Sequence, residues 1–305
     1  LKQAMKQFQI SQEELLSKLD RTLELLKRVQ VEMKLDELKN LAQRIKELQD
    51  KINKGLESGE DVGKLRRMEG EAKKQLEKLQ KQAQELAQQM SEFSDMPSDE
   101  MRKIADELQN QNLPGQAQKA SQQMQSGDMS GAMKTGQNIS SQLQKTAEQM
   151  AGLQQKMNQM LQQELTMDIT RTVQELLYIA QELEKLQLAI ERERDRNKVI
   201  SLASRQEELR TVLRQSLARV GEMGGKSFLL PPAIAAQLAK ADKKMADAGQ
   251  SLSQGHSYSA SKDQREALGG INAAAEMLLR SMESMCQLSL IHISEPTRLG
   301  MISYA

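Results

Sequence analysis

Apolar residues spaced alternately by three and four positions run along the stretch from Ser11 to Ile52, which opens with a capping box formed by Ser11 and Glu14. This spacing places them on one face of a helix, and its mean period of about 3.5 residues predicts a coiled-coil seam. A helix of this length spans roughly 60 Å, so other long helices must cover the seam. The predicted seam consists of Leu16, Leu19, Leu23, Leu26, the polar Gln30, Met33 and, after a one-residue slip, Leu38, Leu41, Ile45, Leu48 and Ile52.

A second seam of the same kind follows, which consists of Leu65, Met68, Ala72, Leu76, Leu79, Ala83, Leu86, Met90 and Phe93. The connection Gly55–Asp61 contains two glycines and short polar side chains, which favour a turn. Because this connection is short, the two helices are predicted to be antiparallel neighbours that cover each other's seams. Residues 1–94 are therefore expected to form one long coiled-coil hairpin.

Residues 95–165 are rich in Gln and Met and predict shorter helices. The first is expected to begin at Pro97, which is tolerated at a helix entry, and to end before Leu113–Gly115. A turn at Ser126–Asp128 separates two weaker helices. Their apolar positions keep helical spacing, which favours helix over a disordered low-complexity tract.

Residues 166–224 predict a second long helical segment, with Asp168 as the cap at its start and a stop at Gly221, Gly224 and Gly225. Residues 225–287 follow with a Leu-Pro lead-in and predict a C-terminal helical hairpin that turns at Gly255.

This last hairpin resembles the earlier stretch around Gly127. A shift of 128 positions superimposes their apolar and small residues without gaps. Such matches also arise by chance between helical sequences, so duplication and coincidence are both open at this point. The matched pairs are Ala120 and Ala248, Met124 and Leu252, Gly127 and Gly255, Ala132 and Ala260, Leu143 and Ile271, Ala147 and Ala275, and Met150 and Leu278.

The composition limits how thick a core can be. The 305 residues include 3 Phe, 3 Tyr and no Trp. Thin contacts between helices can instead be filled by Leu, Ile, Met and Ala, which are abundant here. The predicted fold class is all-α, with elongated antiparallel helical hairpins and coiled-coil segments and no compact globular core.

The charge pattern argues against binding to polyanions. The chain has 43 Lys and Arg against 42 Asp and Glu, a net charge of +1, and the two signs alternate along helical faces. Nucleic acid and anionic membranes attract a basic surplus gathered on one side, and none is visible. We therefore expect no nucleic-acid partner.

Few side chains suggest chemistry, and each has a simpler interpretation. His256 lies in a Gly-His-Ser turn, and no second histidine occurs outside the C-terminal segment that we interpret below as an artefact. The single Cys286 likewise has no activating histidine close in the natural sequence. Met150, Met157 and Met160 could bind soft Cu(I), but Met at helical spacing more often fills seams. We predict no catalytic, cofactor-binding or metal-binding residues, no cofactor and no enzymatic activity.

One loop contains a compact apolar group. Residues 228–232, with the sequence FLLPP, follow the glycine-rich stretch Gly221–Lys226. Packing at a helix junction is the expected role, and contact with a partner is the alternative.

The two ends of the chain suggest that it is cut from a longer protein. From Leu288 to Arg298 the sequence LSLIHISEPTR resembles, at every residue, the translation of a transposase-type sequencing adapter; Leu299–Met301 would cover its index and Ile302–Ala305 the constant adapter behind it. We interpret residues 288–305 as a non-native artefact tail. Leu1 stands in a helical pattern, which indicates a missing N-terminal part.

Several stretches together resemble the helical region of a large bacterial family, the domain of unknown function 4175. The similarity would cover most of residues 11 to 285. The stretches are SQEELLSKLDRTLELLKRVQVEMKLDEL at Ser11 to Leu38, RQEELR at Arg205 to Arg210, LPPAIAAQLAKADKKMADAGQSLSQG at Leu230 to Gly255 and DQREALGGINAAAEMLL at Asp263 to Leu279. The resemblance implies membrane-anchored proteins with transmembrane helices upstream of this region and no assigned catalytic residues.

These observations give an expected function. The chain is predicted to be a non-enzymatic structural or interaction segment, a spacer or docking platform, of a larger membrane-anchored protein of the bacterial cell envelope. Its partners would be proteins bound through the seams, self-association included. The inner membrane would be reached only through the missing upstream part. A helical signal-transducing segment of a membrane receptor is the alternative, which the glycine-broken helices after Leu113 disfavour.

Overall fold

The computed structural model describes residues 2–193 and 195–294, and these residues form helices without a strand, so the all-α prediction is confirmed. In chain order the helices are α1 (Lys2–Ser58), α2 (Val62–Met90), α3 (Ser98–Asn110), α4 (Leu113–Ser126), α5 (Met129–Arg192), α6 (Arg196–Lys226), α7 (Pro232–Ser253) and α8 (Ser257–Ser294). Helix α8 includes the first residues of the adapter-like segment, whereas residues 295–305 lie outside the described part of the chain.

The chain divides into two compact units. Unit 2 is Leu26–Leu161, and unit 1 combines α1 up to Leu25 with the chain from Gln162 onward. Helix α1 and helix α5 each contribute residues to both units.

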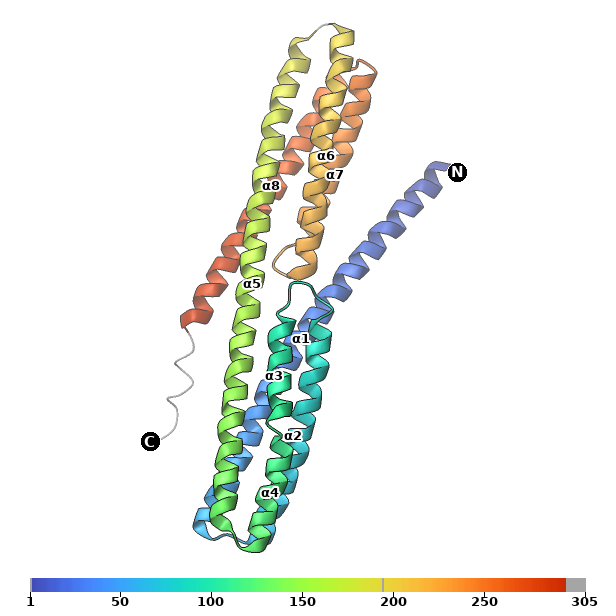
Figure 1. Ribbon diagram of the computed structural model, residues 1–305. Coiled ribbons are helices and arrows are strands. Elements are labelled where there is room, and N and C mark those ends of the chain that lie inside the picture. Colours follow the sequence, from blue (N-terminus) through green and yellow to red (C-terminus); the bar gives the residue numbers. More distant parts are fainter. Residues whose placement is uncertain (1, 194, 295–305) are drawn as a thin grey trace, which may run out of the picture. The chain divides into compact units, whose positions relative to one another are not determined.

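Unit 2 is a bundle in which α3 and α4 follow one another beside α1, α2 and α5. Apolar residues of all five helices form its core clusters. At one end of this unit, the turn from α1 to α2 and the turn from α4 to α5 lie close together (Figure 1), and Ile52, Leu65, Met124 and Ala132 pack there in one cluster. The packing joins the predicted α1–α2 hairpin to the later helices.

Short-range chemistry explains the turn from α1 to α2. Gly59 has a φ of 72°, the left-handed conformation that glycine adopts without strain. The amide of Glu60 then donates to the carbonyl of Gly55 at 2.9 Å, which satisfies a carbonyl left open at the end of α1. The side chain of Asp61 accepts from the amide of Lys64 and caps α2.

Unit 1 pairs the second part of α5 with α6, α7 and α8. Asp195 caps α6 by accepting from the amide of Asn197. Between α5 and α6, Arg219 and Ser216 donate to one carboxylate oxygen of Glu175 at 2.7 and 2.9 Å. Although burial raises the pKa of Glu175, these hydrogen bonds bring it below its ordinary value. The pair of helices is therefore joined by an ionised carboxylate.

Two predicted helix ends are wrong. Helix α1 already begins at Lys2, and Ser11 is an internal helical residue. Helix α5 is continuous through Asp168, so the segment boundary expected near residue 165 lies inside a helix. In α5 the residues before Asp168 continue the helix and bury apolar side chains such as Leu165, so the local cap sequence gains no capping role there.

The stop expected at Gly221, Gly224 and Gly225 lies in the last turns of α6, which ends at Lys226. This helix end is therefore predicted closely. In these turns, Gly224 and Gly225 are buried, and a Cβ placed on Gly225 would come within 2.8 Å of Glu24 Oε2. Gly225 costs helix stability, but it leaves room for the carboxylate end of Glu24 on α1.

Candidate functional site

The first half of the predicted seam on α1 is exposed. Its five apolar members form one face of the helix, which we call the α1 stripe. Their exposed fractions are 59% for Leu16, 56% for Leu19, 54% for Leu23, 58% for Leu26 and 59% for Met33. The second half behaves as predicted, since Leu38, Ile45 and Ile52 are buried. The prediction of one continuous covered seam is therefore wrong.

The slip in the sequence pattern explains this difference. Each residue turns an α-helix by about 100°, so steps of three and four residues stay near one face. The five-residue step from Met33 to Leu38 turns the pattern by about 140° beyond a full turn. The two halves of the seam consequently face different directions, and only the second half faces the core of unit 2.

The face of α1 opposite the stripe is the one that packs. Val31 and Leu35 are buried in the unit 2 core. Arg28 is also buried and donates two hydrogen bonds to Asp95, at 2.8 and 3.0 Å, while its guanidinium lies 4.9 Å from the centre of the Phe93 ring. A bidentate ion pair with a cation–π contact fixes this face against the end of α2. The stripe is left facing away from these contacts.

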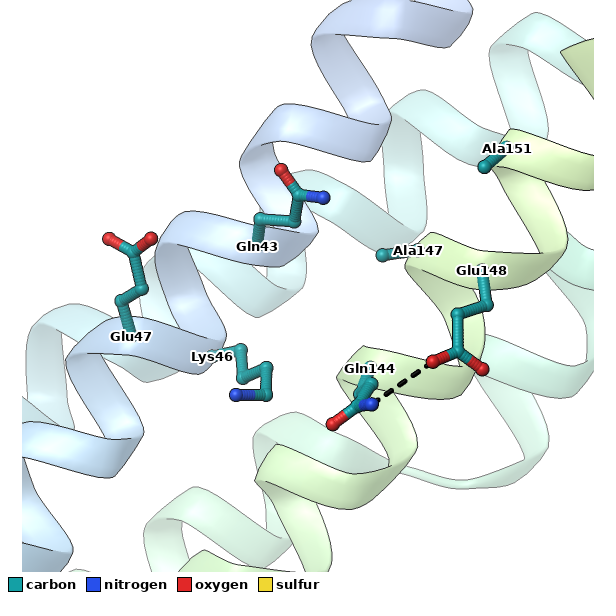
Figure 2. Close-up of a pocket in the computed structure, with 7 residues that line it drawn as sticks. All are labelled: Gln43, Lys46, Glu47, Gln144, Ala147, Glu148 and Ala151. Atoms are coloured by element: carbon teal, nitrogen blue, oxygen red, sulfur yellow. Dashed lines mark hydrogen bonds between the residues drawn. The ribbon is translucent and has the colours of Figure 1, made fainter. Parts of the chain in front are cut away.

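A shallow groove lies between α1 and α5 within unit 2 (Figure 2). Gln43, Lys46 and Glu47 line it from α1, and the small side chains of Ala147 and Ala151 form part of the α5 side. The remaining lining residues, Gln144 and Glu148, hydrogen-bond each other along α5 at 3.0 Å. The groove is open to solvent and its lining includes no His, Cys or Ser, so it offers no nucleophile paired with a base.

A buried polar cluster occupies the interior of unit 2. Glu69 of α2 is 1% exposed and accepts a hydrogen bond from Gln49 of α1 at 3.1 Å. Burial raises the pKa of Glu69 to about 7, and the hydrogen bond from Gln49 opposes this rise. Within the described residues, no protein donor reaches Glu69 Oε1, Gln49 Oε1 or Asn53 Oδ1. The neutral carboxyl is favoured because burial disfavours the charged form.

Gly136 of α5 makes room for this cluster. A Cβ at this position would lie 2.1 Å from Asn53 Oδ1 and 2.7 Å from Gln49 Nε2. The missing side chain at Gly136 therefore leaves the space that the ends of Asn53 and Gln49 occupy.

The residues considered for chemistry are dispersed or packed. Met150 and Met157 are buried in the unit 2 core, while Met160 is 38% exposed. His256 is exposed in the turn between α7 and α8 and donates its backbone amide to Ser251. The structure describes the backbone of Cys286, within α8, and not its side chain. No group of three or more metal-ligating His, Cys, Asp or Glu side chains occurs among the residues described.

The apolar loop after α6 is only partly packed. Leu230 is 2% exposed, whereas Phe228 and Leu229 are 68% and 39% exposed. Leu230 thus fulfils the junction role expected for the FLLPP segment, and Phe228 does not.

Comparison with known proteins adds no assignment: no family model, curated protein or solved structure matches the chain. Within its described part, no helix has both the length and the apolar character needed to cross a membrane. Among the described residues, the α1 stripe gathers five exposed large apolar side chains on one helix face.

Proposed function

We propose that this chain is a non-enzymatic helical interaction segment, a spacer or docking platform, of a larger membrane-anchored protein of the bacterial cell envelope. The exposed α1 stripe carries the proposal. Five large apolar side chains at coiled-coil spacing, each more than half exposed, are costly to leave in water unless another helix covers them.

Two further features support the same function. The charges are balanced and form ion pairs along and between helices, as in Arg210 with Asp242 at 2.9 Å, rather than a one-sided basic surface. The membrane anchor and the bacterial envelope rest on the sequence resemblance to the family named above. These features agree with a scaffold that acts through its surfaces.

The proposal is tested in cells that carry the complete parent gene. A photoreactive amino acid at Leu23 should give covalent adducts with a protein partner, and the parent should fractionate with the inner membrane. The matched control is Leu177, a 49% exposed leucine of α5 that lies outside the stripe and should give few adducts. A parent that fractionates as a free protein and gives equal adducts at both positions would contradict the proposal.

A further inference from the structure

The α1 stripe has the register of a two-helix coiled coil. In the heptad notation abcdefg, Leu16, Leu23 and Gln30 occupy a positions, and Leu19, Leu26 and Met33 occupy d positions. Knobs-into-holes packing requires a partner helix with the same 3.5-residue period. The stripe spans about 26 Å of one continuous helix, which is long enough for three heptads to engage.

We propose that the α1 stripe pairs with the same stripe of a second copy of this chain, as an antiparallel coiled coil. This inference rests on the proposed function and names its partner. The register places Leu23 of each copy opposite Leu26 of the other, with Leu16 opposite Met33 at both ends.

Charge complementarity selects the antiparallel direction. Asp20 and Lys27, both exposed, occupy successive e positions beside the stripe. In an antiparallel pair the e positions of the two helices flank each other, so Asp20 of each copy lies beside Lys27 of the other. In a parallel pair an e position faces a g position, and Lys27 would face the uncharged Thr22. Only the antiparallel arrangement makes two ion pairs.

Lys27 remains accessible for this role. Its ammonium lies 3.7 Å from Glu92 of α2, and both side chains are more than half exposed. An exposed pair at this distance contributes little free energy, and Lys27 can contact a second carboxylate without losing the first.

The area of the stripe agrees with a modest dimer. Covering five large apolar side chains in each of two copies removes on the order of 1,000 Å² from water, near the lower limit for a specific interface. Gln30 would face Leu19 near each end of the pairing, where solvent is close. A lone polar residue in a seam weakens association while restricting its register.

The decisive experiment exchanges the charges in the full chain. In a homodimer of the Asp20→Lys variant, lysine faces lysine at both flanking pairs, and in a homodimer of the Lys27→Asp variant, aspartate faces aspartate. Because like charges repel, each variant alone should form a much weaker homodimer than the wild type. Mixed together, they should form a one-to-one heterodimer, because every lysine then lies beside an aspartate. Sedimentation equilibrium of each variant and of the mixture measures both effects. Dimers unaffected by either exchange would overturn the antiparallel register.

A second pair of variants tests the stripe itself. Leu23→Glu should weaken the dimer by about 30-fold or more, as expected when a central apolar contact is replaced by a charge. Leu177→Glu, at a similarly exposed leucine outside the stripe, should leave the dimer unchanged. Circular dichroism checks that both variants keep their helices.

A wild-type chain that stays monomeric up to about 200 µM would overturn the inference. That outcome leaves the proposed function standing if Leu23 still forms adducts in cells with a different protein. A parent that fractionates as a free protein, but still gives Leu23 adducts between two copies of the chain, would instead contradict the membrane-anchored proposed function alone.

Discussion

The hairpin α4–α5 of unit 2 and the hairpin α7–α8 of unit 1 have the same turn. Gly127 and Gly255 both adopt positive φ, 82° and 73°. The next amide donates back to the preceding helix in both: Asp128 to Gln123 at 2.9 Å, and His256 to Ser251 at 2.8 Å. The equivalent positions are related by the shift of 128 residues found in the sequence.

The buried positions follow the same shift. Ala132 and Ala260, Leu143 and Ile271, and Met150 and Leu278 are each at most 1% exposed. Agreement in turn geometry and in burial is what a duplicated hairpin predicts and chance spacing does not. The comparison thus favours duplication over coincidence.

The two units differ in the kind of polar side chains that they bury at equivalent places. In unit 1, Gln264 donates to Gln206 at 2.8 Å, and Gln206 donates to the carbonyl of Met245 at 3.1 Å. The shift places Gly136 at the position of Gln264. Unit 2 fills the resulting space with Gln49 and Asn53, which lie beside the buried Glu69. A similar bundle therefore contains a neutral amide pair in one unit and an ionisable carboxyl in the other.

The largest effects should come from the core positions that the two hairpins share. Leu143→Ala and Ile271→Ala each remove a fully buried side chain, and each should lower the free energy of unfolding by about 2–5 kcal/mol. Hydrogen exchange measured by mass spectrometry should show faster exchange mainly in the unit that carries the change. Equal acceleration in both units for both variants would mean that the units unfold as one.

The next prediction concerns pH, because only the cluster in unit 2 contains an ionisable carboxyl group. The pKa of Glu69 rises from 4.5 to about 7 on folding, so the folded chain holds this proton more tightly than the unfolded chain. Its contribution to stability is complete below pH 4.5 and is lost as the pH rises through 7, by about 3 kcal/mol. Glu69→Gln should abolish this dependence, which urea unfolding between pH 5 and 9 will measure as the difference from wild type.

The reciprocal change in unit 1 provides the control. Gln206→Glu places a carboxyl in a fully buried position that normally holds an amide. It should make the stability of unit 1 fall with rising pH over a similar range. If Glu69→Gln leaves the pH profile of unit 2 unchanged, Glu69 is hydrated or otherwise relieved of burial in solution.

A smaller effect is expected from filling the space at Gly136. Gly136→Ala should destabilise unit 2 by about 1–2 kcal/mol, because the added methyl group overlaps the buried ends of Asn53 and Gln49. Gly152→Ala, on the same helix, meets no atom within 4 Å and should stabilise α5 by up to about 1 kcal/mol. Thermal unfolding compares the two, and a stabilising Gly136→Ala would show that the cluster can rearrange.

The sequence predicts the helices better than their exposed faces. Heptad spacing correctly identifies the buried Leu38, Ile45 and Ile52, and local turn chemistry correctly locates the ends of α1 and α4. The heptad spacing does not show that the α1 stripe is uncovered. Periodicity identifies the apolar face of a helix, but it does not identify what packs against that face.

The buried polar cluster was also missed. Met68 is the predicted member of the α2 seam, whereas its neighbour Glu69 is buried. The partners of Glu69 lie on α1, and the space for them is created by Gly136 on α5. Such a site depends on packing among distant segments, which a single sequence does not specify.

The smallest effects should come from the two turn glycines. Gly127→Ala should cost about 1 kcal/mol, because alanine is strained at positive φ although no atom lies within 4 Å of the added methyl group. Gly255→Ala adds an approach to 2.6 Å from Arg196 Cγ and should cost slightly more. Asparagine tolerates positive φ, so Gly127→Asn should recover part of the loss. Thermal unfolding of the three variants tests this order. Equal losses for Gly127→Ala and Gly255→Ala would show that the flexible Arg196 side chain moves aside and that backbone strain alone determines both costs.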